Sequence, residues 1–91
     1  MANPPTPPGP IETKVRLGAA LRCLRERRAL TQEELGSLLH MDYRYIRRIE
    51  KGERGVSWYT IVRFLHALEA TVHDLADALA EPPEQTSPHP T

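Results

Sequence analysis

Four cationic side chains are spaced along residues 43–51 so that they fall on one side of a short helix. Ile46 and Ile49 are three residues apart, which places both on the opposite, apolar face. The outward positions are all cationic: Arg44, Arg47, Arg48 and Lys51. A short helix with an apolar underside and a basic upper side suits a negatively charged groove, because its cations can neutralise the anionic groups there. The alternative is an ordinary solvated surface.

The neighbouring residues predict how this basic helix is positioned. Residues 31–52 are predicted to form two short helices joined by a tight turn at 39–42, a segment too short for any other connection. Thr31 and Glu34 have the spacing of a capping box, in which the threonine hydroxyl and the glutamate carboxylate each accept a backbone N–H. Asp42 is a suitable N-cap for the basic helix.

The prolines predict the limits of the folded block. All nine lie in residues 4–10 or 82–90, and proline disrupts helix interiors at a cost of roughly 3 kcal/mol. We therefore expect disordered proline-rich tails at 1–10 and 82–91, and one helical domain at 11–81.

Three more helices are predicted inside this domain. The first spans about 14–28. Another begins after Ser57, and the last begins after Thr71, where Asp74 completes a second capping box. With five helices and no strand-like alternation, the predicted fold class is all-α.

The charge distribution is more informative than the net charge. The formal net charge is zero, which alone argues against a nucleic-acid partner. However, residues 1–54 carry eleven Lys and Arg against seven Asp and Glu, whereas residues 55–91 carry one Arg against five acids. A basic half and an acidic half fit a protein with one face toward DNA and one face turned away.

Other classes of function have little support in the sequence. Cys23 is the single cysteine, so no internal disulfide can form and a reducing, cytoplasmic location is expected; a redox-sensor role for this thiol is the alternative. There is no signal-peptide pattern and no apolar run near the ~20 residues that span a bilayer, so no membrane partner is expected. The four histidines lack metal-ligand spacing, and no nucleophile–base pair is evident; we expect no enzyme, metal or cofactor.

Three motifs carry a resemblance to a known family. LRERRALTQEEL at 24–35, YIRRIEKGERGVS at 45–57 and IVRFLHALEATVHDL at 61–75 resemble the helix-turn-helix domain of the Cro/phage-repressor family, also called the XRE family. The resemblance covers residues 17–75 and all five expected helices. It implies a five-helix Cro/repressor-like fold. Stand-alone members of similar length include restriction–modification controller proteins, antitoxins, and small phage or plasmid repressors.

The resemblance also implies roles for single residues. It assigns base reading to Tyr43, Arg44 and Arg48. Arg47 is added because it is one of the outward cationic positions of the same helix. Gln32 matches a glutamine that contacts a DNA phosphate, and Tyr45 matches a position that touches the DNA backbone. The full set of expected backbone contacts is Thr31, Gln32, Tyr45, Lys51 and Arg54.

Four further positions have structural roles by the same resemblance. Arg25 and Glu50 match a buried ion pair; a loose surface pair is the alternative. Gly36 matches a position where a small residue lets the next helix approach. His40 stands where the family usually has glycine, so it must adopt a left-handed backbone conformation there.

A dimer is expected to form within the helical block, through the last two helices. Trp58 and Val62 lie off the predicted core face and are the first candidate contacts, with Leu75 and Leu79 next. Packing of Trp58 and Val62 on the tails or on the last helix is the alternative.

The function expected from the sequence is sequence-specific binding of double-stranded DNA. A homodimeric transcriptional regulator would bind a roughly palindromic operator through helix 43–51. The second hypothesis is an antitoxin or other interaction module whose main partner is a protein. An enzyme is the third and least supported.

Overall fold

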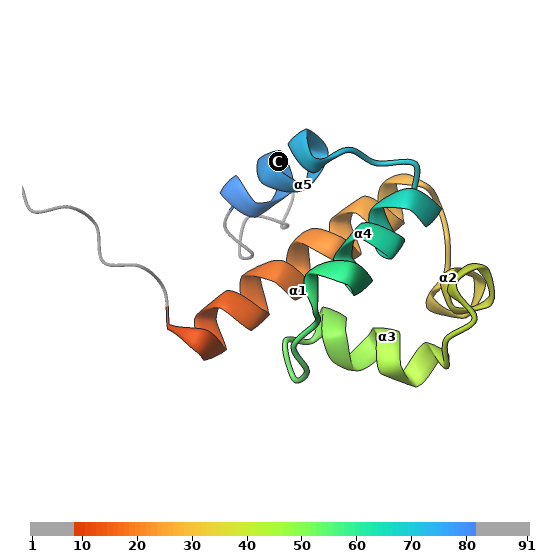
Figure 1. Cartoon of the computed structure of the whole chain (residues 1–91), viewed down its shortest axis with the longest axis horizontal. Helices are drawn as coiled ribbons and strands as arrows, with labels where there is room; N and C mark the ends of the chain where they lie inside the picture. Colours follow the sequence, from red (N-terminus) through yellow and green to blue (C-terminus); the bar gives the residue numbers. More distant parts are fainter. Residues whose placement is uncertain (1–8, 82–91) are drawn as a thin grey trace, which may run out of the picture.

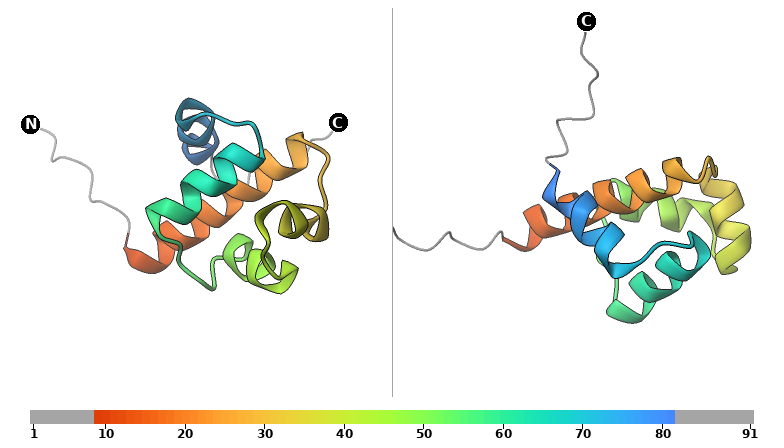
Figure 2. Two further views of the ribbon diagram at one scale, coloured as in Figure 1. Left: turned by 45° about the vertical axis from the view of Figure 1, so that its right-hand side comes forward. Right: turned by 90° about the horizontal axis from the view of Figure 1, so that it is seen from above.

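The computed structural model of the protein describes residues 9–81, which form five α-helices without a strand. The helices are α1 (Pro10–Arg27), α2 (Gln32–Leu39), α3 (Tyr43–Glu50), α4 (Trp58–Ala67) and α5 (Val72–Ala80). The long helix α1 runs through the middle of the molecule, with α5 on one side and the pair α2–α3 on the other (Figure 1). The left view in Figure 2 shows the same order. Helix α1 packs against α3 and α5, and α2 packs against α3 and α4.

Helices α2 to α5 begin where their N-cap residues predict. The Thr31 hydroxyl accepts the Glu34 amide at 3.0 Å, and the Glu34 carboxylate accepts the Thr31 amide at 2.8 Å. The same reciprocal pair joins Thr71 and Asp74 at the start of α5. Both predicted capping boxes are confirmed, as are the N-caps Asp42 at the start of α3 and Ser57 at the start of α4.

Helix α1 begins at Pro10, earlier than the start near residue 14 that the sequence predicted. The sequence pattern predicts Pro10 in the disordered tail, because proline disrupts helix interiors. At the first helical position, however, its missing N–H costs nothing and its fixed φ is already helical. The Gly9 carbonyl accepts the Thr13 amide at 2.9 Å, which closes the first turn. The rest of both predicted tails lies outside the described residues.

One apolar core holds the helices together. It draws on every helix, and its largest fully buried side chains are Leu21, Leu35, Ile46, Ile49, Phe64 and Leu68. Two of these, Ile46 and Ile49, form the underside of α3, as their spacing predicted. Because they are buried, the orientation of α3 about its own axis is fixed.

Two glycines let α3 lie close to its neighbours. A Cβ on Gly36 would lie 2.6 Å from the Met41 carbonyl oxygen and 3.6 Å from Ile46 Cδ1, so only glycine fits there. A Cβ on Gly18 would lie 2.8 Å from the Glu50 carbonyl oxygen. The role of Gly36 was implied by the family resemblance, whereas that of Gly18 was not predicted.

The turn between α2 and α3 is left-handed at His40, with φ 57° and ψ 43°. This confirms the prediction for the position usually filled by glycine. The Met41 amide donates to the Gly36 carbonyl at 2.9 Å, and Arg63 Nη2 of α4 donates to the Leu39 carbonyl at 2.5 Å. A cation at the C-terminus of a helix binds its free carbonyls and complements its dipole. Helix α4 therefore supports the turn that precedes α3.

No helix within residues 9–81 combines the length and apolar composition that a membrane crossing requires.

Candidate nucleic-acid interface

Helix α3 presents its cations to solvent on the side opposite its buried isoleucines. Arg44, Arg47 and Arg48 are exposed, as are Lys51 and Arg54 just after the helix. The structure thus brings the predicted basic residues onto one surface, which we call the basic face: Arg44, Arg47, Arg48, Lys51 and Arg54. Exposed cations gathered on one side of a helix and on the segment that follows it are suited to contact with a polyanion.

Within residues 9–81, Arg44 is the member of the basic face that has an ion-pair partner. Arg44 Nη2 lies 2.9 Å from Asp42 Oδ2. Arg54 lies over the Tyr45 ring, with its guanidinium carbon 5.0 Å from the ring centroid. This cation–π contact places two of the expected DNA-backbone residues together.

The expected ion pair between α1 and α3 is present and buried. Arg25 Nε donates to Glu50 Oε2 at 2.6 Å, and Arg25 Nη2 donates to Glu50 Oε1 at 2.9 Å. The two side chains are 9% and 2% exposed, which rules out the loose surface pair. The hydrogen bond to Glu50 is the main cause that raises the pKa of Arg25. Arg25 Nη1 also donates to the Leu30 carbonyl at 2.6 Å, so the guanidinium is well satisfied.

Gln32 is joined to this buried pair. Its Nε2 donates to Glu50 Oε1 at 3.0 Å, a bond that the sequence did not predict. An amide nitrogen has two N–H groups, so one remains for an outside acceptor. The side chain is at the first turn of α2, where free backbone N–H groups and the helix dipole favour an anion. The phosphate contact expected for Gln32 is compatible with this geometry and stays a prediction.

Thr31 has less to offer a phosphate than its position suggests. Its backbone amide is already bound by the Glu34 carboxylate, and its hydroxyl accepts the Glu34 amide. The hydroxyl proton remains available as a donor. A DNA-backbone contact by Thr31 therefore depends on that single hydrogen.

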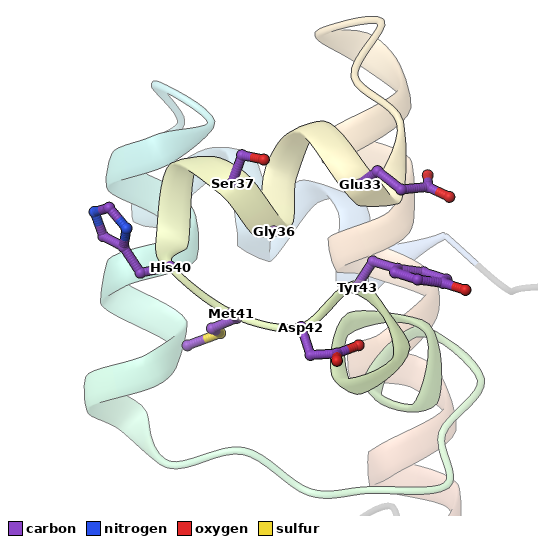
Figure 3. A pocket seen from close by; sticks show the side chains of 7 residues that line it. All are labelled: Glu33, Gly36, Ser37, His40, Met41, Asp42 and Tyr43. Atoms are coloured by element: carbon purple, nitrogen blue, oxygen red, sulfur yellow. The ribbon is translucent and has the colours of Figure 1, made fainter.

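An open hollow separates α2 from the start of α3 (Figure 3). It is lined by Glu33, Gly36, Ser37, His40, Met41, Asp42 and Tyr43. Met41 turns toward α4 and packs on the core, whereas Asp42 and Tyr43 point the other way, outward from the entry to α3. The residues at the start of α3 are therefore accessible from solvent. Residues 9–81 contain no cluster of His, Cys, Asp and Glu suited to a metal ion.

The expected dimer contacts fall into two groups. Trp58 and Val62 on α4 are 59% and 44% exposed, so each keeps a large part of its apolar surface accessible to a partner. Leu75 is 4% exposed and belongs to the monomer core. Leu79 is half-buried and packs against the core beside α1. Leu75 therefore has almost no exposed surface to offer a dimer partner, and Leu79 has only part of its surface available.

The sequence did not single out two other exposed apolar residues on this side of the molecule. Tyr59 is 71% exposed and Leu38 is 55% exposed. Leu38 and Val62 line one groove between α2 and α4, together with Arg63 and His66. The apolar surface around Val62 is therefore larger than the predicted pair alone.

Comparison with known proteins gives a consistent result. A family model described as a helix-turn-helix domain matches residues 16–86. The clp gene regulator ClgR of Corynebacterium glutamicum is 31% identical, with 86% of this chain and 95% of that chain covered and a TM-score of 0.71. The restriction–modification controller protein C.AhdI of Aeromonas hydrophila is 35% identical, covers 69% of this chain and 96% of its own, and has a TM-score of 0.65.

A third solved structure is similar in fold alone. The restriction–modification controller protein C.Esp1396I, as a tetramer in complex with its natural 35 base-pair operator, is 18% identical with a TM-score of 0.67. The match covers 82% of this chain and 100% of that chain. No curated protein matches the chain in sequence.

Proposed function

Because the chain belongs to the helix-turn-helix domain family, whose model matches residues 16–86, we propose that it is a transcriptional regulator that binds specific double-stranded DNA. The observation that carries the proposal is the orientation of α3. Ile46 and Ile49 are buried while the arginines of the same helix are exposed. The core thus fixes the orientation of α3 so that its basic side faces solvent. An α-helix of this kind fits the major groove of B-DNA.

Base reading is assigned to the exposed side chains of α3. Arg44 and Arg48 can each donate two hydrogen bonds to guanine O6 and N7, and Tyr43 can contact a base edge or a thymine methyl. Arg47 is one residue away from Arg48 on the same exposed surface and is the fourth candidate.

Register on the DNA is assigned to contacts with the sugar–phosphate backbone. Gln32 stands at the N-terminus of α2, and Lys51 and Arg54 follow α3. Tyr45 is placed beneath Arg54 by their cation–π contact. Such contacts fix the position of a protein on the duplex and supply salt-dependent affinity without reading sequence.

The regulator is proposed to act as a homodimer. One helix-turn-helix reads too few base pairs for useful discrimination in a genome. Two copies related by a two-fold axis read half-sites about 34–36 Å apart on a roughly palindromic operator. Exposed Trp58 and Val62 on α4 are the proposed contacts, because large apolar side chains on a small surface favour burial against a partner. The similar C.Esp1396I fold is a tetramer on its own operator.

The test is to select duplexes from a random pool with the full chain and then to compare variants on the selected duplex. Arg44→Ala and Arg48→Ala should each weaken specific binding by about 1–3 kcal/mol. Binding to random duplex should weaken much less, and affinity should fall steeply with salt, with a slope of about −0.9 for each phosphate contacted. Equal losses on both duplexes would mean that the arginines contact phosphate only.

The alternative, a module whose main partner is a protein, has one observation in its favour. Tyr59, Leu38 and Trp58 are large apolar side chains that are more than half exposed, and exposed apolar surface of this kind suits a protein partner. An absence of any enriched duplex, together with salt-insensitive binding to a protein, would favour this alternative over the regulator.

A further inference from the structure

Asp42 holds the side chain of Arg44 by one edge. Arg44 Nε donates to Asp42 Oδ1 at 3.1 Å, and Arg44 Nη2 donates to Asp42 Oδ2 at 2.9 Å. This is a two-point contact between a planar guanidinium and a carboxylate, which fixes direction as well as distance. The pair is solvent-exposed, with the side chains 71% and 52% accessible for Arg44 and Asp42. Its effect on stability is therefore small. Its main effect is to fix the orientation of the Arg44 guanidinium.

The carboxylate is itself anchored to the backbone. Asp42 Oδ1 accepts the Arg44 amide at 2.8 Å as the N-cap of α3. The hydrogen bonds from Arg44 lower the pKa of Asp42 to about 2, so the carboxylate is ionised at neutral pH. The Arg44 guanidinium carbon also lies 5.9 Å from the centroid of the Tyr43 ring. Arg44 is thus restrained along one edge by Asp42 and on one face by Tyr43.

The end of the guanidinium remains free. A guanidinium has five N–H groups, and the contact with Asp42 uses the one on Nε and one on Nη2. Of the three that are left, one on Nη1 and the second on Nη2 are parallel and form another fork. That fork has the geometry that a guanine O6/N7 edge accepts.

Asp42 also changes what the start of α3 attracts. Phosphate carries negative charge, and a nearby ionised carboxylate repels it. The O6/N7 edge of guanine is uncharged, so it suffers much less repulsion. Within residues 9–81, Arg47, Arg48 and Lys51 have no such carboxylate partner. The restraint therefore acts on Arg44 in particular.

We propose that Asp42 is a specificity-determining residue that positions Arg44, directing its free edge toward a guanine and away from phosphate. This inference rests on the proposed function of DNA binding. It assigns to Asp42 a role beyond its N-cap. In the complex, the contact between Asp42 and Arg44 is kept while the free fork of Arg44 binds the base.

Asp42→Asn tests the role, because asparagine is as good an N-cap as aspartate but lacks the charge and the second acceptor oxygen. The probes are the duplex that the wild-type full chain enriches from a random pool and a scrambled duplex of equal length. Affinity for the enriched duplex is expected to fall about 3- to 30-fold, part of the value of a bidentate guanine contact. Affinity for the scrambled duplex is expected to rise about two- to fivefold, with a salt slope steeper by about 0.9 as Arg44 becomes free to bind phosphate.

Two controls separate positioning from simple charge. Asp77→Asn removes the same charge from an exposed position on α5 and is expected to leave the ratio of the two affinities unchanged. In an Arg44→Ala background, Asp42→Asn is expected to lose its effect on the enriched duplex. Asp42→Ser keeps an N-cap hydroxyl and repeats the measurement if the asparagine variant melts at a lower temperature.

The outcomes are distinct. The inference is supported if Asp42→Asn lowers the affinity for the enriched duplex and raises that for the scrambled one, and if these changes require Arg44. An equal rise in affinity for both duplexes overturns the inference, as do affinity changes that are the same with and without Arg44. Either result leaves the proposed function intact. A wild-type chain that enriches no duplex overturns the proposed function, and the role of Asp42 falls with it.

Discussion

Replacing Glu50 with alanine is expected to remove a large part of the stability of this domain. Glu50 is the acceptor for three side-chain hydrogen bonds: two from Arg25 and one from Gln32. Its side chain is 2% exposed and that of Arg25 is 9% exposed. Among residues 9–81, the alanine variant leaves the buried guanidinium with the Leu30 carbonyl as its remaining hydrogen-bond partner.

The expected cost is about 3–5 kcal/mol, the range for stranding one partner of a buried ion pair. Domains are stable by only about 0.05–0.15 kcal/mol per residue, so a domain of this size has roughly 4–11 kcal/mol in total. Glu50→Ala should therefore unfold at a much lower urea concentration than the wild type. Urea unfolding followed by far-UV circular dichroism measures the change, provided that the slope with denaturant stays constant.

Two variants make the comparison specific. Glu26→Ala breaks the exposed pair with Arg22, in which both side chains are more than half accessible, and should cost at most about 0.5 kcal/mol. Arg25→Met combined with Glu50→Leu removes both charges and should recover much of the loss, since a buried pair is often no better than apolar packing. A Glu50→Ala variant within about 1 kcal/mol of wild type would refute the reasoning, because the charges would then be solvated rather than buried.

Three further predictions follow from the structure. Gly36→Ala should destabilise the domain by about 1–3 kcal/mol, because its Cβ would lie 2.6 Å from a turn carbonyl; Gly55→Ala, whose Cβ would lie 3.8 Å from its nearest neighbour, should have little effect in the same urea experiment. Trp58→Ser with Val62→Ser should give a monomer by sedimentation with near-wild-type helical content and greatly reduced operator affinity; a dimer that persists would place the interface elsewhere. Because Arg44 lowers the pKa of Asp42 from 3.8 to about 2, the small contribution of this exposed pair to stability is full above about pH 4 and is lost as pH falls toward 2. In an NMR titration, the Asp42 carboxyl should titrate below an ordinary aspartate in the wild type and closer to it in Arg44→Ala; a titration that Arg44→Ala leaves unchanged would show that the pair does not form in solution.

Local signals predicted the starts of four helices because a cap involves residues only two or three positions apart. Thr31, Asp42, Ser57 and Thr71 each accept a backbone N–H of the first turn. The start of α1 was missed because proline has opposite effects at the first position and in the interior of a helix. Nothing in the neighbouring residues distinguished the two cases.

Contacts between distant segments were predictable only where the family resemblance supplied them. It implied the pair Arg25–Glu50, which the structure confirms. It did not supply the bond from Gln32 to Glu50 or the one from Arg63 to the Leu39 carbonyl. These depend on the angles at which helices cross, and no short-range pattern encodes them. Leu75 is a similar case. Its position on the apolar face of the last helix is compatible with the monomer core or with a dimer interface, and the sequence alone does not distinguish the two.

The hydrogen bonds that join Arg25, Gln32 and Glu50, here called the Glu50 junction, have a consequence for redesign of this protein. Positions 25, 32 and 50 share hydrogen bonds, so substitutions there are expected to be strongly non-additive. Exposed positions 47 and 48 have no side-chain bond to that junction among residues 9–81. A library intended to retarget the protein can therefore randomise these two positions freely. Positions 25, 32 and 50 are best held fixed or exchanged together as one cassette.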